Sequence, residues 1–103
     1  MIVIYTLEGC DICNKLKTEL SKLSIDYTEV SCTQEVANCE RLERDVNCNL
    51  YPMCMIVSKY KQKLMICIAK ESNQLNSIRE LASDTVLTYV YSIDNMLNVI
   101  KNT

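Results

Sequence analysis

The chain has 103 residues but only one glycine and one proline, so it offers few positions where the backbone can turn sharply. Average usage would give about seven glycines and five prolines in a chain of this length. Gly9 stands directly before Cys10, and Pro52 stands directly after Tyr51. Glycine permits positive φ and proline fixes φ, so each marks a special backbone position. We therefore expect local structural constraints at these two places.

Length and composition predict a single globular domain that covers residues 1–103. Apolar residues make up 49% of the chain and charged residues 23%, which is typical of a folded protein with a core. The net charge of −2 indicates no basic face, so we expect neither nucleic acid nor a membrane as a partner. The longest apolar runs, 53–57 and 64–69, are far shorter than the roughly 20 residues that span a bilayer.

Seven cysteines are many for a chain of this size, and their number is odd. The first residues lack a basic start and do not look like a signal peptide, so we expect a reducing compartment, the cytoplasm. In that setting, closely spaced cysteines indicate redox or metal chemistry. The chain has no histidine, which excludes Cys–His and Ser–His catalysis and histidine-ligated zinc.

Hydrophobic periodicity predicts alternating strands and helices, which is typical of an α/β fold. Residues 11–23, 34–46 and 73–82 carry apolar positions at helical spacing. The short polar link at residues 59–62, between the strands predicted at 53–58 and 63–69, indicates an antiparallel hairpin. Two early strand–helix units predict a mixed sheet with helices on both faces. The four strands are expected at 1–6, 25–30, 53–58 and 63–69.

The C-terminal segment fits two structures. Apolar positions at helical spacing run from Val86 to Ile100 behind a capping residue, Asp84, which predicts one helix. Residues 86–91 equally fit a strand that precedes a shorter helix. The sequence alone does not separate the two alternatives.

The same segment, about residues 83–103, is an addition to a core of about residues 1–82. Its apolar stripe is expected to cover the sheet or the third helix. A docking surface for a protein partner is the functional alternative, and Tyr89 and Tyr91 on the less apolar side would be available for it.

The main chemical signal is the motif Cys10-Asp11-Ile12-Cys13, which follows a predicted strand and Gly9 and opens a predicted helix. The first N–H groups of a helix have no internal partner and carry partial positive charge, so they stabilise a thiolate and lower the pKa of a cysteine there. Cys13 lies three residues on, on the same helix face. We expect Cys10 to attack a disulfide and Cys13 to resolve the mixed disulfide that forms.

Asp11 is expected to weaken this effect. Its carboxylate competes with the Cys10 thiolate for the positive end of the helix, and Glu8 adds to the competition. We therefore predict that the pKa of Cys10 is lowered less than in a strongly oxidising dithiol protein, which favours a reductant.

A Cys-x-x-Cys pair can also form half of a zinc site. The usual completion is a second such pair, which the sequence lacks, and the spacings Cys32-x6-Cys39 and Cys48-x5-Cys54 fit poorly. We expect no bound metal and no tightly bound cofactor. A metal or iron–sulfur site that uses Cys10 with other thiols is the alternative.

Tyr51-Pro52 stands directly before the third predicted strand. A trans proline is tolerated at the start of a strand. The other interpretation is a cis proline that shapes a substrate groove beside the cysteines. Spacing alone does not choose between them.

The stretch from Val3 to Cys13 resembles the active-site strand, turn and helix of glutaredoxins and of the related glutaredoxin-like reductants of ribonucleotide reductase. Residues 25–30 are similar to their second strand, and Tyr51-Pro52 stands where that family keeps a cis proline. The resemblance covers about residues 1–82. It implies a thioredoxin-like, three-layer α/β fold: a four-stranded mixed sheet with flanking helices, here followed by a C-terminal helical extension.

The resemblance also implies roles. Cys10 would be the nucleophile and Cys13 the resolving thiol, while Pro52 would be cis and Tyr51 would offer backbone hydrogen bonds to an extended substrate or glutathione. The chain would then be a small cytoplasmic dithiol–disulfide oxidoreductase. The alternative is a thioredoxin-like binding or structural module, for example within a larger assembly, whose thiols are idle.

The chain departs from the family pattern at three places. Leu7 stands where glutaredoxins usually carry a lysine that holds a glutathione carboxylate. Ala69-Lys70 stands near their usual Gly-Gly pair, and Asp11-Ile12 replaces the frequent Pro-Tyr between the cysteines. A protein disulfide is therefore at least as suitable a substrate as a glutathione mixed disulfide.

The other five cysteines are expected to divide by sequence context. Cys54 and Cys67 lie within apolar strand runs and are expected to be small buried hydrophobes, whereas Cys32, Cys39 and Cys48 are expected to be less buried. On one helix Cys32 and Cys39 would be ~10 Å apart, too far for a disulfide. A bridge between Cys39 and Cys48 is conceivable through a returning loop, so a second disulfide or a regulatory thiol is an open hypothesis.

Overall fold

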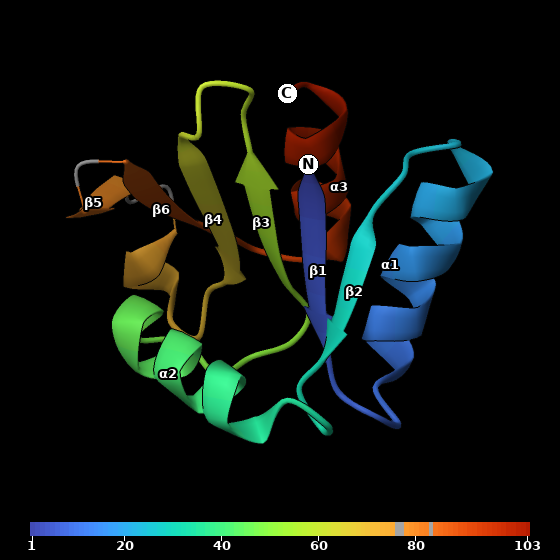
Figure 1. Cartoon of the computed structure of the whole chain (residues 1–103), viewed down its shortest axis with the longest axis horizontal. Helices are drawn as coiled ribbons and strands as arrows, with labels where there is room; N and C mark the ends of the chain where they lie inside the picture. The colour runs from blue at the N-terminus through green and yellow to red at the C-terminus, as the bar shows by residue number, and fades with distance from the viewer. Residues whose placement is uncertain (76–77, 83) are drawn as a thin grey trace.

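A computed structural model describes residues 1–75, 78–82 and 84–103 of the chain. Within these ranges the strands form one sheet of six, in the order β2-β1-β3-β4-β6-β5 (Figure 1). The elements in chain order are β1 (Ile2–Thr6), α1 (Asp11–Lys22), β2 (Thr28–Ser31), α2 (Val36–Val46), β3 (Met53–Val57), β4 (Lys63–Ile68), the short 3₁₀ helix η1 (Ser72–Gln74), β5 (Ile78–Ala82), β6 (Thr85–Val90) and α3 (Ile93–Lys101).

The sheet is mixed, which confirms the predicted class of fold. β1 runs parallel to β2 and antiparallel to β3, and β3 and β4 form the predicted antiparallel hairpin. β6 then adds to β4 in parallel, and β5 pairs with β6 in the antiparallel sense. The expected number of four strands is wrong, because β5 and β6 extend the described sheet to six.

Side chains alternate across the sheet and build two cores, one on each face. On β3, Met53 and Met55 face the core beneath α2, while Cys54 and Ile56 face the core beneath α1 and α3. Figure 1 shows α2 on one side of the sheet and α3 on the other. The prediction of helices on both faces is therefore confirmed.

The second helix begins later than expected. The predicted start was residue 34, whereas α2 begins at Val36. The preceding residues form a turn in which the N–H groups of Gln34 and Glu35 both donate to the carbonyl of Ser31, at 3.1 Å and 2.8 Å. This turn places the last residue of β2 close to the first turn of α2.

The helix predicted over residues 73–82 is wrong for the part that the structure describes; residues 76 and 77 lie outside that part. Residues 72–74 form η1, and residues 78–82 form β5, an edge strand that pairs with β6. Ile78 is 76% exposed, so the apolar position that suggested a buried helix face does not enter a core. Backbone pairing with β6 makes residues 78–82 a strand, although the spacing of their apolar residues had indicated a helix.

The C-terminal segment follows the second alternative, a strand before a short helix. β6 pairs with β4 from Thr85 to Val90, and α3 then buries Met96 and Ile100 against the sheet. Tyr89 is buried, and its hydroxyl donates to the carbonyl of Val46 at 3.2 Å, so it is not available to a partner. Tyr91 is 77% exposed. No helix in the described ranges is both long enough and apolar enough to cross a membrane.

Candidate active site

The motif of two cysteines lies where β1 turns into α1. Gly9 takes a positive φ of 75°, a conformation that glycine adopts without steric cost, and this turn delivers Cys10 to the N-cap of α1. The N–H of Cys13 donates to Cys10 Sγ at 3.2 Å. Cys10 therefore occupies the position whose side chain normally satisfies the free N–H groups at a helix start.

Cys10 and Cys13 are joined by a disulfide, with their Cα atoms 5.2 Å apart. Cys13 is fully buried, whereas Cys10 is partly exposed at the surface. Cys10 is thus the sulfur that an outside molecule can reach, whereas Cys13 is shielded from solvent by the fold. This division of exposure is what the roles of attacking and resolving thiol require.

The rim around Cys10 is partly apolar. Leu7 is 41% exposed and Ile12 is 48% exposed, and they flank Cys10 in the chain on either side. Glu8 and Asp11, also exposed, place two carboxylates in the same turn. The segment 7–12, which contains Cys10, therefore exposes two apolar side chains and two carboxylates to solvent.

The structure brings Tyr51 and Pro52 to the same end of the sheet. Met53, the residue after Pro52, pairs with Tyr5 near the end of β1, so Pro52 lies beside the strand end that leads to Cys10. The Tyr51–Pro52 peptide bond is cis, in agreement with what the resemblance implies. Tyr51 is buried in the same core as Cys13, and burial, followed by the nearby carboxylate of Glu43, raises the pKa of Tyr51 to about 12.

A second disulfide lies at the same end of β1 and β2 as this site, and it joins Cys32 and Cys39, a pair that the sequence excluded only if both lay on one helix. The two residues are bridged, with Cα atoms 5.6 Å apart. The separation of ~10 Å holds for two residues on one helix, whereas Cys32 precedes α2 in the turn and Cys39 lies in its first turn. Both are buried, at 5% and 3% exposure, so the expectation of lower burial is wrong.

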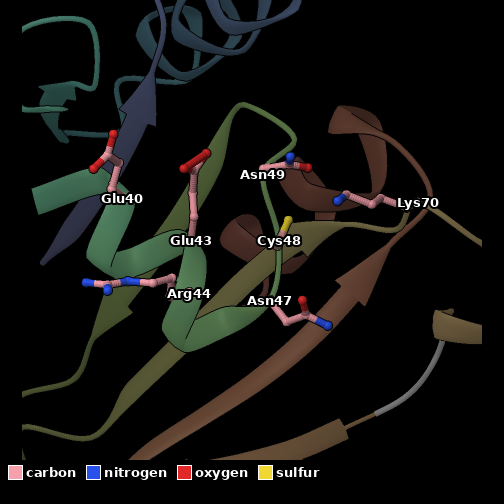
Figure 2. A pocket seen from close by; sticks show the side chains of 7 residues that line it. All are labelled: Glu40, Glu43, Arg44, Asn47, Cys48, Asn49 and Lys70. Carbon is pink, nitrogen blue, oxygen red and sulfur yellow. The ribbon is translucent and has the colours of Figure 1, made fainter. Parts of the chain in front are cut away.

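Cys48 is a free thiol, and it too is more buried than expected. It lines a pocket of about 480 Å³ beside the C-terminal half of α2 (Figure 2). Its neighbour is Cys67 on β4, and the Cys48 thiol also points at the carbonyl of Ile68, with an S···O distance of 3.8 Å. The other lining residues are Glu40, Glu43, Arg44, Asn47, Asn49 and Lys70.

The pKa values of Cys48 and Cys67 shift in opposite directions. The Cys67 thiol donates to Cys48 sulfur, which lowers the pKa of Cys48 and raises the pKa of Cys67. Lys70, whose side chain extends toward Cys48 in Figure 2, lowers the pKa of Cys48 further, while Glu43 opposes it. Sequence reasoning missed this pair because Cys48 and Cys67 are 19 residues apart and meet only through the sheet.

Cys54 differs from the cysteines above. It is fully buried in the core beneath α1 and α3, and burial alone raises the pKa of its thiol to about 12. The expectation that Cys54 and Cys67 are buried within strands is confirmed. Among the residues that the structure describes, no group of three or more cysteines and carboxylates gathers as metal ligands.

Comparison with models of known protein families, with curated proteins and with solved structures finds no match for this chain.

Proposed function

We propose that this chain is a dithiol–disulfide oxidoreductase of thioredoxin-like fold, in which Cys10 attacks and Cys13 resolves. One observation carries the proposal: a partly exposed cysteine caps a helix and is bridged to a fully buried cysteine one turn deeper. The helix start supplies free N–H groups that stabilise a thiolate after reduction. A structural bridge in a core would need neither the exposure nor this position.

The arrangement of the first four strands supports the fold that we propose. Their order is β2-β1-β3-β4, with β1 and β2 parallel and the two other pairs antiparallel. α2 covers one face, and α1 and α3 cover the other. In this proposal β5 and β6 are an insertion between the fourth strand and the last helix.

The reaction proceeds by two thiol–disulfide exchanges. The Cys10 thiolate attacks one sulfur of a substrate disulfide, forms a mixed disulfide and releases the other sulfur as a thiolate. Cys13 then attacks Cys10 Sγ, which releases the second substrate thiolate and forms the Cys10–Cys13 bridge. Two electrons pass from the chain to the substrate, and a thiol donor restores the dithiol. A reducing cytoplasm would supply that donor.

The rim of the site favours a protein disulfide as substrate. Leu7 and Ile12 present exposed apolar surface beside Cys10, which suits an apolar stretch of polypeptide. A small anionic thiol such as glutathione would instead approach Glu8 and Asp11, whose carboxylates repel it. We therefore propose a protein disulfide as the main substrate and glutathione as a slower one.

The test is reduction of a model protein disulfide and of a glutathione mixed disulfide by wild-type protein and by Cys10→Ser, with a thiol as electron donor. We expect wild-type protein to reduce both, the protein disulfide faster, and Cys10→Ser to lose the activity. Serine is itself a good N-cap, so this change leaves α1 intact.

Cys54→Ala is the matched control, because Cys54 lies on the opposite face of the sheet. It should retain the activity. If wild-type protein reduces neither substrate, the proposal fails and a binding module with idle thiols is favoured. If Cys10→Ser is as active as wild type, the activity belongs to another thiol.

A further inference from the structure

The turn that carries Cys10 and the turn that carries Cys32 are held together. Thr6 and Ser31 are partners in the parallel pair β1–β2, and the N–H of Cys32 donates to the carbonyl of Thr6 at 2.8 Å. The N–H of Glu8 donates to Thr33 Oγ1 at 2.9 Å. Both turns therefore leave the sheet side by side, at the C-terminal ends of β1 and β2.

This attachment places both disulfides at the C-terminal ends of β1 and β2. Cys10 is two residues beyond Glu8, and two residues span at most about 7 Å. Cys13, Cys32 and Cys39 are buried in one continuous core, and Cys10 packs against it. Of the four cysteines in the two bridges, only Cys10 is more than 5% exposed. An outside thiol thus reaches the first bridge and is kept from the second.

We propose that Cys32 and Cys39 are a second redox pair, which is reduced from inside the protein by Cys10 and Cys13. This inference rests on the proposed exchange chemistry of Cys10. A small thiol from solution first reduces the Cys10–Cys13 bridge and is itself oxidised to its disulfide. The chain then passes both electrons inward and stores them where solvent thiols and disulfides do not reach.

The internal step is a balanced exchange. The Cys10 thiolate attacks Cys32 Sγ, the Cys32–Cys39 bond breaks, and Cys39 leaves as a thiolate. Cys13 attacks Cys10 Sγ, the Cys10–Cys32 bond breaks, and Cys32 leaves. The Cys10–Cys13 bridge is formed again, Cys32 and Cys39 are reduced, and the two thiol protons move with the electrons. The reverse sequence returns the electrons to Cys10.

The test measures how fast the Cys32–Cys39 bridge opens when the oxidised full-length protein meets dithiothreitol. Samples are quenched with acid, alkylated and digested with trypsin, which places Cys10 and Cys13 in peptide 1–15 and Cys32 and Cys39 in peptide 23–41. We expect opening to be about tenfold or more slower in Cys10→Ser/Cys13→Ala than in wild type, because only direct attack on a buried bridge remains. Unfolding would speed opening, so a slower rate cannot come from a damaged fold.

Cys13→Ala provides the second measurement. It keeps Cys10 but cannot resolve the intermediate, so we expect a disulfide between peptides 1–15 and 23–41 to accumulate. Cys54→Ala, on the other face, should behave as wild type in both measurements. Opening at the wild-type rate in the double variant, or no linked peptides in Cys13→Ala, would overturn the inference.

The inference and the proposed function fail separately. A chain that reduces an external disulfide through Cys10 but shows no linked peptides keeps the proposed function and loses the inner pair. A chain that yields the linked peptides but reduces no external disulfide keeps the inner exchange and loses the proposed function.

Discussion

The two faces of the sheet are built from different chemistry. Among the described residues, the core beneath α2 contains five buried cysteines, with Cys10 packed against it, whereas the core beneath α1 and α3 contains one cysteine, Cys54. That second core is otherwise aliphatic with one methionine, as Ile4, Leu16, Leu20 and Ile66 illustrate. Both cores are buried to a similar degree, so burial alone does not explain where sulfur gathers.

This difference suggests that stability and thiol chemistry depend on different faces of the sheet. Bridges that open and close change the packing around them, so a redox core is a poor place for the contacts that hold a small protein together. An aliphatic core on the opposite face is insensitive to thiol chemistry. Under the proposed function, the α1–α3 face would supply stability and the α2 face would supply the thiol chemistry.

The largest effect should come from a cavity on the aliphatic face. Leu20 on α1 is fully buried, and Leu20→Ala should lower the free energy of unfolding by about 3 kcal/mol through lost burial and the cavity left behind. Urea denaturation followed by circular dichroism measures this loss. Because Leu20 and the two bridges belong to different cores, we expect the same loss with and without reductant. A loss that differs by more than about 1 kcal/mol between the two conditions would show that the faces are coupled.

A second prediction compares one free thiol from each face. Cys48 has a lowered pKa because the Cys67 thiol donates to it, whereas burial raises the pKa of Cys54 to about 12. In oxidised protein at pH 8, we expect an alkylating reagent to label Cys48 about a hundredfold faster than Cys54, since the thiolate is the reactive form and Cys48 lines a pocket, whereas Cys54 is fully buried. Mass spectrometry of the digested protein measures both rates.

Two controls sharpen this comparison. In denaturant, both thiols should label at similar rates, because the folded environment is gone. Cys67→Ala removes the hydrogen-bond donor, so the pKa of Cys48 should rise and its labelling should slow, while Cys54 should not change. If Cys54 labels as fast as Cys48 in the folded protein, the chemical difference between the faces is not real.

Local sequence predicted the elements that depend on near neighbours. The periodicity of residues 11–23 gave α1 to within one residue, and the polar link after Ser58 gave the β3–β4 hairpin. β6 was harder, because its parallel pairing with β4 joins residues such as Leu64 and Val86 that are far apart in the chain. Such pairing leaves no short-range pattern that separates a strand from an amphipathic helix.

The candidate site shows the same limit at finer scale. The roles of Cys10 and Cys13 followed from a motif, a glycine and a helix start, all adjacent in sequence, and they remain predictions for experiment. The Cys32–Cys39 bridge depended on whether Cys32 belongs to the helix: it lies in the turn before α2, where the spacing of two residues along one helix does not apply. Helix boundaries are the least predictable part of a sequence, because caps and turns compete on equal terms there.

The smallest expected effect is on the pH dependence of stability, and it comes from a contact between α1 and β2 at the edge of the sheet. Glu29 accepts hydrogen bonds from the buried Thr6 hydroxyl at 2.6 Å and from Lys17 at 3.0 Å, and these bonds hold the pKa of Glu29 below its ordinary value. A lowered pKa stabilises the fold above the ordinary pKa of about 4.5, and the contribution is lost as pH falls through the folded value. The Glu29 side chain is 37% exposed, so screening by water keeps the effect on stability below about 1 kcal/mol.

Denaturation of wild type and Glu29→Gln at pH 6 and pH 3 tests this prediction. The difference in stability between the two proteins should shrink at the lower pH and should be the same with and without reductant. A difference that stays constant with pH would mean that Glu29 acts there only as a neutral hydrogen-bond acceptor.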